Sequence, residues 1–273
     1  MMEEKISIVV PTYNRESVIG RAVHSILCQT YEDYEIIVVD DGSTDQTRMV
    51  VEQFADERIR YIRLEGNHGA GYARNVGIRE SRYDYVAFLD SDDEWRRCKL
   101  ELQMQRMQEL PPEVGLVYCR MAGERGEGRG RFCVPSYEYD RGLLEGDMFR
   151  FLLRQNVIGT PTILARSECL MQSGGFKETL RCIEDYELIL RIARAWKIGL
   201  VDEVLVEVHK TADSLTCRVG DQLVSGCYIV SKYRREMAAF GILDAVKADI
   251  LDLACRHGVQ EAIEELLTRD FEL

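Results

Sequence analysis

A short apolar run that ends abruptly in acids constrains this chain more than any other segment. Tyr85 to Leu89 is almost continuously apolar, the pattern of a strand buried on both faces of a parallel sheet, and Asp90-Ser91-Asp92-Asp93 follows at once. Ligands of open α/β sheets bind at the carboxyl ends of the strands, where crowded carboxylates repel one another unless a cation is present. The segment therefore predicts a Mg²⁺ or Mn²⁺ site. The same residues also suit a solvated turn and helix N-cap, and alone they do not decide the matter.

Two earlier strands end in the same polar way. Ile6 to Val10 is stopped by Pro11, and Ile36 to Val39 runs into Asp40-Asp41-Gly42-Ser43. Three segments between and after these strands have helical periodicity. They are residues 18–29, a helix opened by a Ser43/Gln46 capping box and running through Phe54, and a helix carrying Arg74 and Asn75. A weaker strand is predicted from Ile59 to Leu64. This alternation predicts a parallel, doubly wound α/β sheet with polar strand ends along one edge.

The second half of the chain is more varied. The patterns predict a helix through Glu109, strands at Val114–Cys119, Thr160–Ala165 and residues 198–209, helices at Leu143–Leu153 and up to Trp196, and a surface loop at Gly123–Arg131. Two or three amphipathic helices follow from Asp221. We therefore expect one α/β domain at residues 1–212, divided at about residue 110, and a helical extension at residues 213–273.

Composition excludes some kinds of partner. A formal charge of -12 and a pI near 5.0 argue against nucleic acid, which would require a basic face. The nine cysteines form no C-x-x-C and are odd in number, which is typical of thiols in a reducing cytoplasm. With no signal-peptide pattern and no apolar run long enough to span a membrane, we expect a cytoplasmic protein, and peripheral membrane attachment stays open.

Taken together and in order, the motifs resemble family 2 glycosyltransferases, the inverting GT-A enzymes that use nucleotide-sugars. The matching segments are residues 9–15, residues 38–45, Asn67 to Gly77, residues 88–93, Gly174-Gly175-Phe176 and Glu184-Asp185. The resemblance covers roughly residues 5 to 210. It implies a GT-A fold, which is a Rossmann-like, mostly parallel sheet flanked by helices, with the helical C-terminal appendage lying outside it.

The resemblance also implies roles for individual residues. The nucleotide-sugar would contact Pro11, Thr12, Tyr13, Asn14, Arg15, Asp41, Arg74, Asp90 and Ser91. Asp92, with His209 as a second candidate, would ligate Mn²⁺ or Mg²⁺. Asp185 would be the catalytic base, with Glu184 as the alternative. Each arginine also suits a salt bridge, Glu184-Asp185 suits a helix N-terminus, a lone histidine is usually structural, and Asp93 suits a cap on the following helix.

The function that follows from the resemblance is transfer of a sugar, with UDP the default carrier, to an acceptor hydroxyl. The acceptor would be a free or lipid-linked glycan in cell-surface polysaccharide or lipopolysaccharide biosynthesis. A sugar-1-phosphate nucleotidyltransferase is the competing enzyme, but it should carry a Gly-rich basic loop after the first strand, where Pro11 to Asn14 stand. A non-catalytic nucleotide-sugar-binding protein is the other alternative. The sequence leaves open a homo-oligomer formed through the C-terminal helices.

Overall fold

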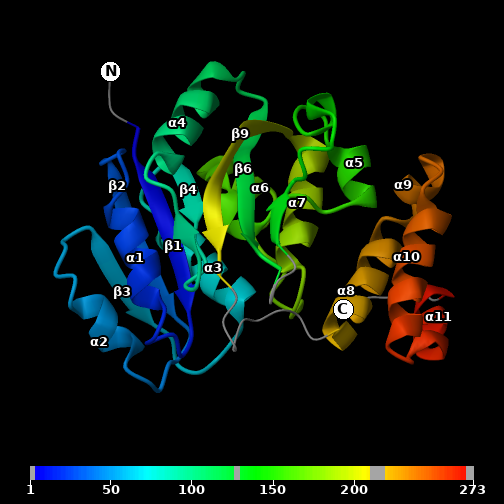
Figure 1. Cartoon of the computed structure of the whole chain (residues 1–273), viewed down its shortest axis with the longest axis horizontal. Helices are drawn as coiled ribbons and strands as arrows, with labels where there is room; N and C mark the ends of the chain where they lie inside the picture. Colours follow the sequence, from blue (N-terminus) through cyan, green and yellow to red (C-terminus); the bar gives the residue numbers. More distant parts are fainter. Residues whose placement is uncertain (1–3, 126–129, 210–218, 269–273) are drawn as a thin grey trace.

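The strands of the computed structural model, which describes residues 4–125, 130–209 and 219–268, join into one sheet (Figure 1). Among these residues the sheet has nine strands in the order β3-β2-β1-β4-β8-β6-β9-β5, with β7 paired to β6. The strands are β1 Ile6–Thr12, β2 Tyr34–Asp40, β3 Ile59–Arg63, β4 Tyr85–Phe88, β5 Glu94–Trp95, β6 Val114–Glu124, β7 Arg131–Val134, β8 Leu164–Arg166 and β9 Lys197–Val208.

Helices lie on both faces of this sheet. They are α1 Ile19–Leu27, α2 Thr47–Glu52, α3 Ala70–Glu80, α4 Lys99–Glu109, α5 Phe149–Arg154, α6 Ser167–Gln172, α7 Glu184–Ala195, α8 Val219–Lys232, α9 Arg234–Ala239, α10 Leu243–Arg256 and α11 Gln260–Thr268, with the 3-10 helices η1 Arg141–Leu143 and η2 Thr160–Thr162. This arrangement confirms the predicted α/β fold with C-terminal helices.

The first four strands of the sheet are parallel, as the alternation predicts. Thr12 of β1 is in register with Asp40 of β2, and Val9 with Phe88 of β4, so the three polar strand ends meet at one edge. The second half is mixed, because β8 runs antiparallel to both β4 and β6, whereas β6 and β9 are parallel.

Alternate residues of the central strands supply two hydrophobic cores. Ile8 and Val10 point toward α1 and α4, whereas Val9 points toward the side covered by α3, α5 and α7. Helix α3 approaches β1 so closely that a Cβ atom on Gly77 would stand 2.2 Å from Val9 Cγ1. This close approach holds α3, the helix that carries Arg74, against β1.

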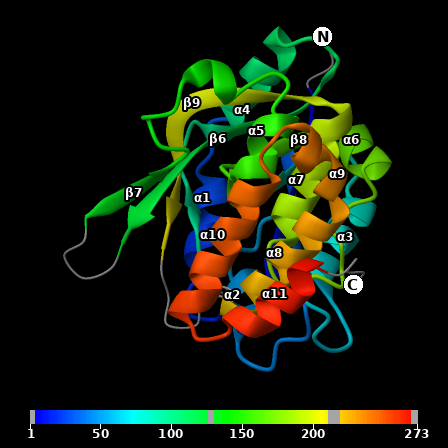
Figure 2. The same ribbon diagram turned by 90° about the vertical axis from the view of Figure 1, so that its right-hand side faces the viewer.

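The C-terminal helices pack on the outer side of α7 (Figure 2). The buried carboxylate of Glu187 in α7 pairs with Arg191 at 2.6 Å and also with Lys232 of α8. Arg194, also in α7, pairs with Glu236 of α9 at 2.7 Å. The expected boundary near residue 212 lies outside the described residues.

Several local predictions are wrong for identifiable reasons. Ser43 does not cap α2, because its Oγ accepts from the backbone N–H of Asn14 at 2.8 Å. The predicted strand at Thr160–Ala165 begins as η2, since the Thr162 hydroxyl turns back to the carbonyl of Gly159. The predicted helix from Leu143 is interrupted, with only η1 and α5 helical.

Two further expectations change in part. The predicted loop at Gly123–Arg131 belongs to a hairpin, because β6 continues to Glu124 and β7 starts at Arg131, and residues 126–129 lie outside the described ranges. Cys182 is disulfide-bonded, whereas the cysteine pattern predicts thiols. Spacing along a chain does not show which sulfur atoms the fold brings together.

Candidate active site

The loop after β1 is held by the loop after β2. Asn14 has a left-handed backbone (φ 50°), and its carboxamide oxygen accepts from the N–H of Thr44 at 2.8 Å. The backbone N–H of Arg15 donates to Thr47 Oγ1 at 2.8 Å. Tyr13 is therefore presented on a fixed loop, with 41% of its surface exposed, while Pro11 and Thr12 are buried at the strand end.

Asp41 organises the entrance to α3. Its carboxylate accepts from the backbone N–H of His68 at 2.9 Å and of Gly69 at 2.7 Å. Each carboxylate oxygen has two acceptor positions, so this arrangement still leaves lone pairs directed outward. The predicted nucleoside contact of Asp41 is compatible with this second, structural role.

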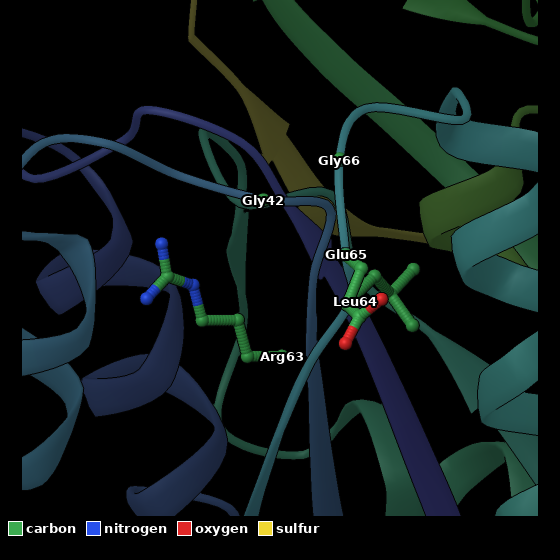
Figure 3. A pocket seen from close by; sticks show the side chains of 5 residues that line it. All are labelled: Gly42, Arg63, Leu64, Glu65 and Gly66. Carbon is green, nitrogen blue, oxygen red and sulfur yellow. The ribbon is translucent and has the colours of Figure 1, made fainter.

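A pocket of about 330 Å³ lies at Gly42, the residue that follows Asp41 in the chain (Figure 3). It is lined by Gly42, Arg63, Leu64, Glu65 and Gly66. Gly42 has φ +83°, and a Cβ atom there would stand 2.7 Å from the carbonyl oxygen of Gly66. Glycine is therefore required at position 42, because it alone lets the two loops meet beside Asp41.

The acidic segment after β4 is held by hydrogen bonds from α1 and from the residue that follows β9. Arg21 of α1 donates to the backbone carbonyl of Asp92 at 2.5 Å, and Ser91 is buried. Asp93 is buried as well, and its Oδ1 accepts from the backbone N–H of His209 at 3.2 Å. The expectation that Asp93 caps a helix is wrong, because α4 begins only at Lys99.

The crowding of these acids affects the ionisation of Asp93. Burial raises the pKa of Asp93 to about 8, and the nearby carboxylates of Asp90 and Asp92 add to the effect. The end of β9 brings in His209, whose Nε2 lies 3.3 Å from Oε2 of Glu94. No group of three potential metal-ligating side chains is already assembled in the described ranges. Few protein ligands and neighbouring carboxylates nevertheless fit a cation that keeps substrate oxygens in its shell.

Arg74 joins the two sides of the site. One terminal nitrogen donates to Asp90 Oδ1 at 2.7 Å, and the other donates to Glu184 Oε1 at 2.6 Å. Burial alone would lower the pKa of Arg74, but the carboxylates of Asp90 and Glu184 outweigh this effect, and the pKa is raised. The guanidinium also lies 5.3 Å from the ring centre of Phe176. Because one side chain contacts both carboxylates, Asp90 on the predicted donor side faces Glu184, the neighbour of the predicted base Asp185.

Asp185 occupies the first turn of α7 beside this bridge. Burial raises the pKa of its carboxyl group to about 6, the carboxylate of Glu184 raises it further, and Arg74 opposes the shift. Its Oδ2 accepts from Thr160 Oγ1 at 3.1 Å, and its Oδ1 from the N–H of Tyr186 at 2.7 Å. A partly buried carboxylate with a pKa near neutrality suits a general base.

Comparison with known proteins identifies the family. Residues 7–168, more than half of the chain, match the model of Glycosyl transferase family 2. The chain belongs to glycosyltransferase family 2. The resemblance drawn from its motifs is therefore confirmed.

The relatives found among curated proteins are themselves glycosyltransferases. The putative teichuronic acid biosynthesis glycosyltransferase TuaG of Bacillus subtilis is 46% identical over 167 residues, covering 60% of this chain and 62% of TuaG. The glucosyltransferase WfgD of Escherichia coli is 43% identical over 113 residues, covering 41% and 44%. An uncharacterized glycosyltransferase of Rickettsia felis is 30% identical over 85% of this chain, which spans only 37% of that protein.

Solved structures share the GT-A fold. Mannosyltransferase PcManGT of Pyrobaculum calidifontis superposes with a TM-score of 0.70 at 18% identity, covering 100% of this chain and 77% of its own. Residues 1–349 of S. aureus TarS give a TM-score of 0.65 at 20% identity, with coverages of 96% and 84%. In the part of the chain that the structure describes, no helix has the length and apolar character needed to cross a membrane.

Sequence patterns missed two contributors to the site. Thr160 contacts Asp185, although the two residues are 25 positions apart. Arg21 holds the main chain of Asp92 from the first turn of α1. Neither belongs to a recognisable motif, so only the folded chain shows that they reach the acidic residues.

Proposed function

We propose that this glycosyltransferase moves a sugar from a UDP-sugar to an acceptor hydroxyl with inversion, in the assembly of a cell-surface glycan. The observation that carries the proposal is the Arg74 bridge, which sets Asp90 of the donor side opposite Glu184, next to Asp185. This geometry supports one carboxylate group that binds the donor and another that activates the acceptor.

The donor would lie along the polar strand ends. We assign the nucleoside to Pro11, Thr12, Tyr13 and Asp41, where an exposed aromatic ring lies near a carboxylate that retains acceptor capacity. Thr12 Oγ1 is buried without a hydrogen-bond partner among the described residues, which supports a ligand contact there.

The ribose and the diphosphate would continue along the same edge. We assign the ribose to Asp90 and Ser91, and the diphosphate to the loop of Asn14 and Arg15, with Arg74 offsetting its charge. The Arg74 guanidinium lies beside Asp90, which supports both assignments.

Asp92 and His209 would hold a divalent cation. The carboxylates of Asp90, Asp92 and Asp93 are crowded, and His209 is held nearby through its backbone N–H to Asp93, with its imidazole 3.3 Å from Glu94; such groups are a suitable donor set for Mn²⁺ or Mg²⁺. Such an ion neutralises charge that develops on a leaving diphosphate.

Asp185 would act as general base on the acceptor. Its carboxylate takes the proton of the acceptor hydroxyl while that oxygen forms a bond to the anomeric carbon, and the bond from this carbon to the diphosphate oxygen breaks. Attack occurs opposite the leaving group, so one displacement inverts the anomeric configuration. Glu184, with its Oε1 bonded to Arg74, would orient the start of α7.

The relatives support the choice of donor and of metal. WfgD is named for a UDP-Glc donor, TarS has been crystallised with UDP-GlcNAc, and PcManGT with GDP-Man and Mn²⁺. TuaG and WfgD, named for teichuronic acid biosynthesis and a diphosphoundecaprenol-linked acceptor, support a cell-surface glycan.

The test separates donor binding from chemistry. Asp185→Asn keeps the shape but cannot accept a proton, so we expect UDP-sugar affinity to persist while UDP release from UDP-Glc or UDP-GlcNAc falls by about a hundred- to ten-thousand-fold. Glu184→Gln is the matched control on the same helical turn and should lose less. An Asp185→Asn enzyme with near-normal turnover would remove Asp185 from the mechanism.

A thermal-shift screen tests the carrier and the metal. A ligand that binds only the folded protein raises the melting temperature by mass action. We expect UDP with Mn²⁺ to stabilise the protein more than GDP, CDP or dTDP, and EDTA to abolish the shift. Equal stabilisation by UDP in EDTA and in Mn²⁺ would contradict metal-dependent binding.

A further inference from the structure

The 3-10 helix η2 lies against the carboxylate of Asp185. Thr160, its first residue, is only 3% exposed, and its hydroxyl donates to Asp185 Oδ2 at 3.1 Å. The N–H of Tyr186 donates to the other oxygen at 2.7 Å. Each oxygen of the carboxylate therefore has one fixed donor and keeps a further acceptor position.

Two side chains from elsewhere hold η2 in place. Trp95 Nε1 donates to the carbonyl of Pro161 at 2.9 Å, and Gln103 Nε2 donates to the carbonyl of Thr162 at 2.8 Å. Gln103 is completely buried, and Trp95 is 3% exposed. These bonds restrain the backbone of η2, so the Thr160 hydroxyl meets Asp185 from a fixed position.

Trp95 also links this contact to the donor side of the site. It lies on β5, two residues after Asp93, and its ring is covered by the ammonium group of Lys99 at 3.9 Å. The segment that carries the proposed metal ligand Asp92 thus continues directly into the residue that anchors η2. A single short stretch of chain therefore positions parts of both halves of the site.

We propose that Thr160 is a positioning residue, whose hydroxyl orients the Asp185 carboxylate and favours its charged form during sugar transfer. The inference rests on the proposed role of Asp185 as the base. Among the residues that the structure describes, the other charged groups facing Asp185 are Glu184 on its own helix and Arg74 on α3, which is itself paired with Asp90. Glu184 opposes the charged form and Arg74 favours it, and the Thr160 hydrogen bond adds to the effect of Arg74.

The experiment measures kcat/KM for UDP release against pH. The pKa of Asp185 is raised to about 6, so activity of the native enzyme should fall as the pH drops through that region. Thr160→Val removes a hydrogen bond to the charged form, and we expect the acid limb to move upward by about one pH unit. Thr160→Ser keeps a hydroxyl and should restore the limb to its original position.

Thr162→Val is the matched control. Thr162 lies in the same 3-10 helix, is 1% exposed, and donates its hydroxyl to the carbonyl of Gly159 at 2.6 Å. This substitution perturbs η2 without removing a bond to Asp185, so the acid limb should stay in place. A shift as large in Thr162→Val as in Thr160→Val would overturn the proposal.

Further outcomes separate this inference from the proposed function. An inactive Asp185→Asn enzyme together with an unshifted limb in Thr160→Val refutes the role of Thr160 alone. A fully active Asp185→Asn enzyme refutes the proposed base, and the inference with it. Thr160→Ala serves if the valine variant does not fold, and an unshifted limb in it overturns the proposal in the same way.

Discussion

Replacement of Arg74 by methionine tests the bridge that joins the two halves of the site. The Arg74 side chain is 7% exposed, whereas the carboxylates that it pairs with are 29% exposed at Asp90 and 13% at Glu184. Methionine fills much of the same volume but leaves two neighbouring carboxylates without their cation. The cost should be larger at Glu184, because water reaches Asp90 more easily.

The magnitude follows from this burial. Breaking a buried ion pair by removing one partner typically costs about 3–5 kcal/mol, and the accessibility of Asp90 places this case near the lower limit. A loss of about 3 kcal/mol in a chain of this size lowers the melting temperature by roughly 6–12 °C. Adding Glu184→Gln removes one uncompensated charge, so the double variant should be more stable than the additive sum of the two single changes.

Thermal and urea unfolding of Arg74→Met, Glu184→Gln and the double variant give this coupling directly. Arg48→Met is the control, because the Arg48–Glu52 pair is exposed on both sides and should contribute nothing measurable. If Arg74→Met melts with the native protein, or if the two changes are strictly additive, the bridge does not hold the site together.

Three further outcomes can be measured. Gly77→Ala should destabilise the protein by about 1–3 kcal/mol in urea unfolding, since its methyl group would overlap Val9, whereas Gly20→Ala in α1 has ordinary contact distances and should be tolerated; equal melting temperatures would contradict the close packing. Burial lowers the pKa of Lys99 from 10.5 to about 8, so the native protein gains stability as the pH rises from about 8 to 10.5, where the amine is neutral in the folded chain but still charged in the unfolded chain. The stability of Lys99→Met relative to the native protein should therefore decline over that range. A constant difference would show that the amine is not desolvated. Lys232→Met should lower the melting temperature, because the buried Glu187 would keep Arg191 as its remaining ion-pair partner among the described residues. Lys247→Met is the control and should leave the melting temperature unchanged, because Lys247 forms no ion pair with another described residue.

The sequence by itself determined the parallel part of the fold and the family. Apolar runs such as Ile6 to Val10 and Tyr85 to Leu89 have few alternatives to buried strands, and the polar groups that end them must meet at one edge once the strands are parallel. These local constraints made the parallel pairing of the strands and the position of the acidic segment foreseeable. The helix starting at Glu184 followed from an equally local signal, because the Glu184-Asp185 pair suits a helix N-terminus.

The tertiary structure alone decided how the second half completes the site. The sequence suggested a strand where η2 forms, because Thr162 and its neighbours have a strand-like composition. The hydrogen bond from the Thr162 hydroxyl to the carbonyl of Gly159 could not be foreseen from that composition. Asp93 resembled a helix cap but receives the N–H of His209 from the end of β9. Arg74 suited either a salt bridge or a phosphate, and only the fold set Asp90 and Glu184 on either side of it. These contacts join residues far apart in the chain, so they depend on strand register and helix packing, which no single segment encodes.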